Sequence, residues 1–176
     1  MRTTMRQSCI RTICLSGLLV LVAAGTAFPQ KSSPAKIPNG FYAVLSVESS
    51  REKARSDSIP NIVLVYDGKY VDSSQTASPS YVALDTVSFV PLILEGSPTT
   101  KKDGNGRTQL GVTLSRKYVK TLEDFTKAHL GGRLATVLGG EIITMHKIRS
   151  VISEGKVQIT RCYDNACEVL LSKLTQ

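Results

Sequence analysis

Residues 110–145 read LGVTLSRKYVKTLEDFTKAHLGGRLATVLGGEIITM, and several hydrophobic periodicities follow one another within this stretch. Apolar residues alternate with Gly and Thr over residues 110–114, as in a strand with one buried face. Bulky residues then recur at the spacing of a helix: they are Tyr118, Leu122, Phe125 and His129. The pair Gly131-Gly132 follows directly and is typical of a helix end. The stretch therefore predicts a strand followed by an amphipathic helix.

Further strands and a second helix are predicted after residue 132. Residues 134–138 and 141–145 are apolar runs separated by Gly139-Gly140, which indicates a tight hairpin turn. Residues 156–160 alternate as a last strand. A final helix capped by Asp164 or Asn165 is predicted from an apolar stripe that comprises Ala166, Leu170, Leu171 and Leu174.

The order of these elements predicts the fold class. Hairpins join neighbouring strands, and this connection excludes an all-parallel layout. We therefore expect an α+β fold, with an antiparallel or mixed β-sheet and two helices packed on one face of it.

The region before residue 110 predicts additional strands, which are residues 41–47, 61–66, 81–85 and 88–94. Pro91 restricts the last of them to the edge of a sheet, because proline cannot donate a ladder hydrogen bond. Asp67-Gly68 predicts a tight hairpin between residues 65–66 and residues 69–71. The polar residues 73–80 are expected to form a loop.

Residues 97–107 contain the sequence Asp103-Gly104-Asn105-Gly106 and are predicted to form an exposed turn. A calcium loop is the alternative. An EF-hand requires more oxygen ligands at regular spacing and a terminal Glu in register, and this segment has neither. The turn is therefore the favoured interpretation.

The N-terminus has the layout of a secretory signal peptide. Positive charge comes from Arg2, Arg6 and Arg11, and the segment after them is mostly apolar over residues 13–24. Small residues precede a cleavage site predicted after Ala27, so residues 1–27 are expected to be removed. The alternative is an uncleaved anchor, but the apolar run is shorter than the roughly 20 residues that span a bilayer as a helix. Lipid attachment is not expected, because Cys9 and Cys14 do not follow the apolar run.

After cleavage, residues 28–40 are rich in proline and predict a flexible linker, and residues 41–176 are expected to form a single α+β domain. The formal net charge is +8, and three of the arginines lie in the signal. The remaining Lys and Arg residues are scattered and the chain has no Trp, so a nucleic-acid partner is not expected. A solvated basic surface is favoured over loose attraction to anionic lipids or glycans.

Within the second half, residues 132–144 read GRLATVLGGEIIT and are followed by Ile148, Ile152, Gly155 and Gln158-Ile159-Thr160. This pattern resembles the head subdomain of the first periplasmic domain of SecD, in the SecDF family. The strand and helix of residues 110–130 and the closing helix fit in order and spacing, so the resemblance extends over residues 108–176. The sequence departs from the family pattern at Gly139, His146 and Arg161, where the family commonly has Asp, Pro and Gly.

SecD is a membrane subunit that helps to pull secreted polypeptides out of the Sec translocation channel. It works through membrane-spanning helices, and no segment after the predicted signal is long and apolar enough to form one. The resemblance therefore implies a free-standing, non-catalytic module, exported to the periplasm or the extracellular space. It also implies binding to a polypeptide or an envelope protein. No cofactor and no metal ion are expected. The sequence does not indicate an oligomeric state.

Two cysteines, Cys162 and Cys167, remain after the predicted cleavage, and exported thiols are usually oxidised. We expect a disulfide between them, which closes a small loop and stabilises the domain by roughly 2 kcal/mol. The alternatives are a redox pair or a metal site with His146. The spacing is not that of a C-x-x-C motif, and no second ligand pair is present.

The usual signatures of hydrolases, zinc proteases and nucleotide-binding enzymes are absent from the sequence. We therefore do not expect an enzyme. The alternative is a small exported hydrolase or ligand-binding enzyme that uses His129 or His146 with a nearby carboxylate. A pocket in which polar groups converge on either histidine would favour it.

Overall fold

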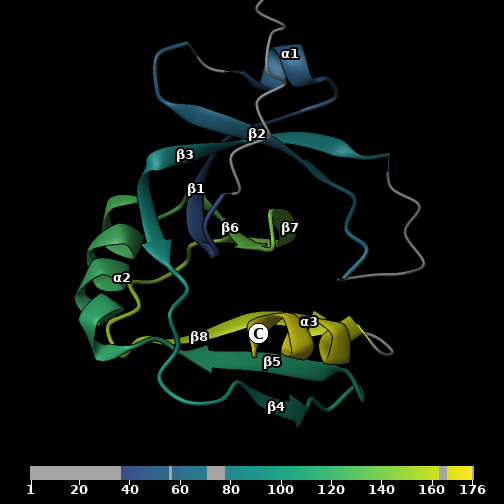
Figure 1. The fold of residues 1–176 in the computed structure, drawn as a ribbon, viewed down its shortest axis with the longest axis vertical. Helices are drawn as coiled ribbons and strands as arrows, with labels where there is room; N and C mark the ends of the chain where they lie inside the picture. Colours follow the sequence, from purple (N-terminus) through teal and green to yellow (C-terminus); the bar gives the residue numbers. More distant parts are fainter. Residues whose placement is uncertain (1–36, 56, 71–77, 163–165, 176) are drawn as a thin grey trace, which may run out of the picture. The chain divides into compact units, whose positions relative to one another are not determined.

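The structure, a computed structural model, describes residues 37–55, 57–70, 78–162 and 166–175, without the side chains of residues 160–162 and 166. Figure 1 shows the strands and helices of these ranges. In chain order they are β1 (Gly40–Glu48), α1 (Arg51–Ala54), β2 (Asn61–Tyr66), β3 (Ser80–Pro91), β4 (Thr99–Lys102), β5 (Thr108–Thr113), α2 (Arg116–Ala128), β6 (Arg133–Leu138), β7 (Glu141–Lys147), β8 (Lys156–Cys162) and α3 (Ala166–Leu174).

The strands form two sheets, a five-stranded sheet in the order β2-β3-β1-β6-β7 and a three-stranded sheet in the order β4-β5-β8. All the neighbouring strands pair antiparallel. The α+β class and the antiparallel pairing are confirmed. The expectation of one sheet is wrong, and the packing of both helices on one face of it is not confirmed.

Strand β1 connects the two halves of the chain within the larger sheet. It pairs with β3 on one side, where Phe41 faces Val90, and with β6 on the other, where Phe41 faces Thr136. Strand β6 begins the hairpin that carries the family-like pattern. The first strand of the domain is therefore a central strand of the sheet that contains this hairpin.

The largest hydrophobic cluster lies between the two sheets and under α2. Leu122 and Phe125, from the predicted stripe of α2, are buried in it. They meet residues of both sheets: Phe41, Ala43, Val90 and Leu134 from the larger sheet, and Val112 and Ile159 from the smaller. The amphipathic helix therefore covers a core to which both sheets contribute.

Helix α3 packs over the smaller sheet, next to β5 and β8 (Figure 1). Its residues Cys167 and Leu170 are buried together with Leu110 on β5 and with Leu138 and Ile143 on the β6–β7 hairpin. This second cluster again joins residues of the two sheets. Burial of its apolar stripe holds the short helix in place, since helices of this length are marginal in isolation.

The opposite face of the larger sheet buries a separate apolar cluster around Tyr42, Val82 and Ala135. The outer strands β2 and β7 lie in contact, so this sheet is strongly curved around the cluster. Both faces of the central strands are therefore covered. This explains why residues 41–47 form a nearly continuous apolar run instead of alternating.

The hairpin predicted at Asp67-Gly68 does not form, because β2 pairs with β3 and residues 69 and 70 lie in a turn. Gly68 has a φ of 72°, and the Asp67 carboxylate accepts a hydrogen bond from the Lys69 amide at 3.2 Å. Tyr70 is buried in the cluster beneath α3. Tyr70 therefore packs in this cluster and does not pair in a hairpin, and residues 71–77 lie outside the described part.

The two strands predicted at 81–85 and 88–94 form one bulged strand, β3. At the bulge, the carboxylate of Asp85 accepts hydrogen bonds from the amides of Val87 and Ser88 at 2.8 and 3.2 Å. Strand β2 pairs only with the first half of β3, so no strand of the described part pairs with β3 on that side at Pro91. Proline therefore occupies an edge position within an otherwise central strand.

Part of the exposed turn predicted at 97–107 is strand β4, which pairs with β5. The turn itself is closed by Asp103. Its carboxylate accepts hydrogen bonds from the amides of Asn105 and Arg107 at 2.9 and 3.0 Å, and from the guanidinium of Arg107 at 3.0 Å. The Asp103 carboxylate therefore stabilises the turn. This role agrees with the predicted exposed turn, which the sequence favoured over a calcium loop.

Residues 37–40 are packed against the domain, so the linker predicted for residues 28–40 is wrong over this segment. Ile37 is buried, the Tyr42 hydroxyl donates to the Pro38 carbonyl at 2.8 Å, and the Gly139 amide donates to the Asn39 side chain at 2.7 Å. Residues 28–36 and the predicted signal lie outside the described part. Within the described ranges, no helix has the length and apolar character needed to span a membrane.

Candidate functional site

His129, the first histidine singled out in the sequence, ends α2. It is the C-cap residue, and its ring lies 4.7 Å from that of Phe125 at an angle of 47°. The following turn is held by a hydrogen bond from the Gly131 amide to the Ile148 carbonyl. His129 therefore packs at the end of the helix, and no carboxylate contacts its ring in the described part of the chain.

His146 lies near the end of β7 and links the two sheets. Its Nε2 is 2.9 Å from the backbone carbonyl of Ile159 on β8. The buried hydroxyl of Thr144, two residues earlier on β7, donates to the same carbonyl at 2.9 Å. The outer strand of the larger sheet is thus joined to an outer strand of the smaller one by side chains, without a ladder between them. His146 and Thr144 have a structural role at this junction.

A pocket of about 240 Å³ opens beside His146. Its apolar floor includes Leu134, Ile148, Ile152 and Val157, which come from both sheets and from the segment between β7 and β8. Buried Thr126 on α2 also lines it, and its hydroxyl accepts a hydrogen bond from the Ile152 amide at 3.0 Å. The junction of the sheets therefore leaves an apolar hollow at the surface.

The rim of this pocket is basic, and its charged or titratable lining residues are His146, Lys147, Arg149 and Lys156. Lys147 and Arg149 are exposed and lie at the end of β7 and just after it. Among the described residues, no Asp or Glu lines the pocket. A cationic rim above an apolar floor can hold an anionic group attached to an apolar one.

A broader groove of about 380 Å³ crosses the outward face of the smaller sheet. Its lining residues come from all three strands and include Thr99, Lys101, Gln109 and Gly111. Lys156, Val157 and Gln158 line both the groove and the pocket. The two hollows therefore adjoin along β8.

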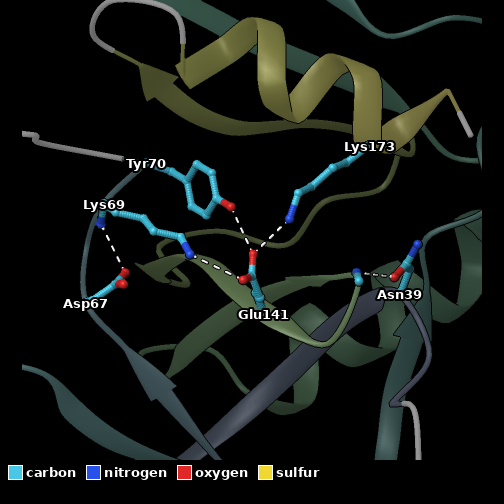
Figure 2. Close-up of polar contacts among 7 residues, drawn as sticks. Asn39, Asp67, Lys69, Tyr70, Glu141 and Lys173 are labelled. Carbon is cyan, nitrogen blue, oxygen red and sulfur yellow. Dashed lines mark hydrogen bonds and ion pairs between the residues drawn. The ribbon is translucent and has the colours of Figure 1, made fainter.

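A second polar cluster surrounds Glu141, the first residue of β7 (Figure 2). Its carboxylate accepts hydrogen bonds from Lys173 Nζ at 2.8 Å, from the Tyr70 hydroxyl at 2.9 Å and from Lys69 Nζ at 3.2 Å. Figure 2 shows these side chains converging on Glu141 from α3 and from the turn after β2. The carboxylate thus ties three separate segments together.

This network lowers the pKa of the Glu141 carboxyl from about 4.5 to about 2. The hydrogen bond from Lys173 contributes most, that from Tyr70 comes next, and partial burial opposes both. The same pairing raises the pKa of Lys173. The carboxylate is therefore held ionised, as suits a clamp between segments and not a proton donor at neutral pH.

We predict that Glu141→Gln lowers the free energy of unfolding by about 1 kcal/mol at pH 7, because the charged hydrogen bonds to Lys69 and Lys173 are lost. The estimate is modest because the Glu141 side chain is 43% exposed and solvent screens the charges. Since the folded-state pKa lies below the unfolded value, the advantage of the wild type is present above about pH 5 and declines as the pH falls toward 2. Urea unfolding at several pH values measures it.

Glu95→Gln is the matched control, since Glu95 pairs with an arginine side chain that is 92% exposed, at 3.3 Å. We expect this change to alter stability by less than about 0.5 kcal/mol at any of these pH values. A Glu141→Gln loss that stays constant down to pH 2 contradicts the role given to its charge.

The predicted disulfide lies partly outside the described residues, since the side chain of Cys162 is not among them. Cys167 is buried beside Leu170, and its sulfur lies 3.5 Å from the Thr108 carbonyl. The part described contains no cluster of three His, Cys, Asp or Glu side chains suited to a metal ion, but the alternative of a metal site includes Cys162 and is therefore not tested. The Cys162–Cys167 pairing stays a prediction.

We expect reduction of the exported protein to lower the free energy of unfolding by roughly 2 kcal/mol, because the closed loop restricts the unfolded chain. Thermal unfolding with and without reductant measures this. Alkylation of the denatured, unreduced protein followed by mass spectrometry is the direct check. Labelled thiols at Cys162 and Cys167, or an unchanged midpoint on reduction, contradict the pairing.

The sequence interpretation did not single out Glu141, Lys147, Arg149 or Lys173. Glu141 follows Gly139-Gly140 and belongs to a predicted strand and to the SecD-like pattern, and its charge at the start of a mostly apolar run is a signal that could have been noted. Lys147 and Arg149 flank Ile148 after the apolar part of β7, a short basic group that could have been noted. Their partners and the hollow between them arise from residues distant in the chain.

Comparison with protein families supports the resemblance deduced from the sequence. The family model described as the SecDF P1 head subdomain matches residues 91–168. The match begins earlier than the predicted residue 108, so it includes the end of β3 and the β4–β5 hairpin, and it ends at residue 168, so it includes only the start of α3. This part of the chain is similar to the SecDF head subdomain, and the resemblance is confirmed.

Comparison with solved structures identifies SecDF proteins. One, described as a membrane component that enhances protein export, is 29% identical over 48% of this chain and 39% of its own, with a TM-score of 0.41. SecDF in a super-membrane-facing form is 16% identical over 82% of this chain and 29% of its own, with a TM-score of 0.41. SecDF from Thermus thermophilus is 16% identical over 81% of this chain and 31% of its own, with a TM-score of 0.37.

The chain spans less than two fifths of the length of each of these structures. No curated protein matches it.

Proposed function

We propose that the chain is an exported, non-catalytic module that binds polypeptide in the cell envelope. The observation that carries this proposal is the match of residues 91–168 to the SecDF P1 head subdomain. A solved SecDF is described as a membrane component that enhances protein export. A module of this kind, outside the cytoplasm, has unfolded or emerging polypeptide as its natural ligand.

The surface of the matched region supports binding. The pocket beside His146 has an apolar floor that can bury a side chain, and the adjoining groove can hold the chain on either side of it. Sites with an apolar interior and a few polar groups at the rim are typical of ligand binding. Both hollows are formed mainly by residues within 91–168.

The alternative of a hydrolase that uses His129 or His146 finds no favourable contact. It requires a carboxylate near the ring, and no described residue that lines the pocket beside His146 carries one. His146 instead faces the Ile159 carbonyl, and His129 packs on Phe125. The structure thus favours a binding role over this alternative.

Export is proposed from the N-terminal sequence and has its own test. We expect the protein expressed from the full sequence in a bacterial host to be recovered outside the cytoplasm, with Phe28 as its first residue. Cell fractionation and N-terminal sequencing measure this outcome. An intact chain found in the cytosol contradicts the export part of the proposal.

The binding test uses the processed protein and a fluorescent, reduced and carbamidomethylated polypeptide that cannot fold. We expect saturable binding, seen as a rise in fluorescence anisotropy, and the polypeptide to remain uncleaved on a gel. The folded, disulfide-intact form of the same polypeptide is the control and is expected to bind at least about tenfold more weakly, because its apolar side chains are buried. Equal binding of both forms, or no binding of either, contradicts the proposal.

A further inference from the structure

The rim of the pocket beside His146 has a uniform sign of charge. Lys147, Arg149 and Lys156 line it together with His146, and none of the lining residues in the described ranges is acidic. These cations come from two separate segments, the end of β7 and the start of β8. The fold therefore concentrates positive charge at a hollow that the sequence alone does not reveal.

The rim cations are available to a ligand. In the described ranges, no carboxylate forms an ion pair with Lys147 or Arg149. Lys156 contacts Glu154 at 3.5 Å, but the two side chains are 72% and 78% exposed. Such exposed pairs contribute little and exchange readily for another partner. Within the part described, the protein's own carboxylates thus leave most of the positive charge of the rim unpaired.

The floor of the pocket is mostly apolar, and the buried hydroxyl of Thr126 in it is already hydrogen-bonded. The Thr126 hydroxyl donates to the Leu122 carbonyl at 2.9 Å and accepts from the Ile152 amide at 3.0 Å. Around it lie Leu134 and Ile148, both less than 10% exposed. The floor therefore suits an apolar side chain, and a ligand needs both an apolar part and a negative charge to use the whole pocket.

The adjoining groove indicates how long this ligand is. The groove continues from Lys156 and Gln158 across β5 to Lys101 on β4. Gly111 keeps its middle open: a Cβ atom there would lie 3.1 Å from the Thr99 hydroxyl oxygen. Two hollows that share residues suit an extended chain better than a single small anion.

We propose that the pocket beside His146 selects acidic segments of extended polypeptides, with a carboxylate on the basic rim and a neighbouring apolar side chain on the floor. This inference rests on the proposed function and names the substrate class. Lysine and arginine form charge-assisted hydrogen bonds with carboxylates, and these are stronger than neutral ones. Two or three such contacts distinguish an acidic segment from its amide counterpart.

The first test compares peptides that differ only in charge. Three fluorescent peptides of equal length carry Leu-Glu, Leu-Gln or Leu-Lys repeats and are titrated with the processed protein at constant salt. We expect the Glu peptide to bind about tenfold more tightly than the Gln peptide, and the Lys peptide to bind more weakly still, because each exposed ion pair contributes a factor of about two to five. Higher salt is expected to narrow the difference.

The second test changes the rim. The double variant Lys147→Glu with Arg149→Glu is expected to lose the preference for the Glu peptide. The control is Lys53→Glu with Arg55→Glu, which makes the same change in net charge at exposed residues in and just after α1, outside the lining of both hollows. We expect the control to retain most of the preference. Since all four side chains are exposed, we expect both variants to keep the thermal midpoint of the wild type, which circular dichroism checks.

The outcomes separate this inference from the proposed function. Equal affinity for the three peptides overturns the acidic selection while leaving polypeptide binding in place. An equal loss of preference in the pocket and control variants assigns the selection to net charge and overturns the site. A third outcome is that the protein binds anionic vesicles tightly and that no peptide displaces it from them. That result assigns the rim to lipid headgroups and also overturns the acidic selection. If neither the peptides nor the unfolded polypeptide bind, both proposals fail.

Discussion

Replacing Phe41 by alanine is expected to lower the free energy of unfolding by about 3–5 kcal/mol. Phe41 is fully buried on central strand β1. It belongs to the cluster that contains Val112 and Ile159 of the smaller sheet and Leu122 of α2. Removal of its ring leaves a cavity between the two sheets. Each sheet is held by its own backbone hydrogen bonds, so the side chains around the cavity can fill it only partly.

Urea unfolding monitored by circular dichroism measures this loss. Val87→Ala is the control, because the Val87 side chain is 71% exposed, and the expected change there is less than about 0.5 kcal/mol. A Phe41→Ala variant that loses less than about 1 kcal/mol contradicts a core shared by the two sheets. Either variant can also be compared in the polypeptide-binding assay, where Val87→Ala should bind as the wild type does.

The second large effect is expected at Gly40, where alanine should lower the free energy of unfolding by about 3 kcal/mol, at the upper end of the range for overpacking. A Cβ atom at this position would lie 2.7 Å from the backbone oxygen of Val90, 3.1 Å from the Phe89 ring and 3.2 Å from the Tyr42 ring. Because Gly40 pairs with both neighbouring strands, the backbone cannot move away without disturbing the sheet.

Gly104→Ala is the matched control for this substitution. A Cβ atom there meets nothing within 4 Å, and the backbone is not in the left-handed region. We expect it to change stability by less than about 0.5 kcal/mol. If Gly40→Ala and Gly104→Ala change the free energy of unfolding equally, Gly40 is not closely packed. Residues 37–40 would then fit the linker predicted from the sequence.

Most of the local structure of the second half was predicted correctly from the sequence. The helix of residues 116–128, the β6–β7 hairpin and β8 all follow from patterns within one segment. At the hairpin turn, Gly139 and Gly140 have φ values of 60° and 83°, which glycine adopts at little cost. Patterns of this kind are reliable because neighbouring residues decide them.

The errors occurred where a distant residue decides the conformation. Asp67-Gly68 has the composition of a hairpin turn, but Tyr70 is drawn into the cluster beneath α3 and hydrogen-bonds to Glu141, 71 positions later. Residues 37–40 have the composition of a linker, but they pack on the hairpin that contains Gly139. Composition describes only local preference, and burial outweighs it.

The candidate site was predicted only in part, since His146 was singled out but its surroundings were not. Its contact with Ile159 requires the end of β7, in one sheet, to approach β8, in the other. The basic rim requires Arg149 and Lys156 to lie at one pocket, and the floor requires α2 beneath them. The residues that make these contacts lie far apart in the chain, so they form no sequence motif of fixed spacing.

By itself, the sequence determined the strands and helices of the second half, the α+β class and the similarity of that half to the SecDF head, because hydrophobic period and glycine position are local properties. The tertiary structure alone decided that the strands divide into two sheets, that β1 pairs with β6, and that Glu141 and the basic pocket have their present neighbours. These features depend on which apolar surfaces bury one another across long stretches of chain, and that choice minimises the free energy of the whole domain.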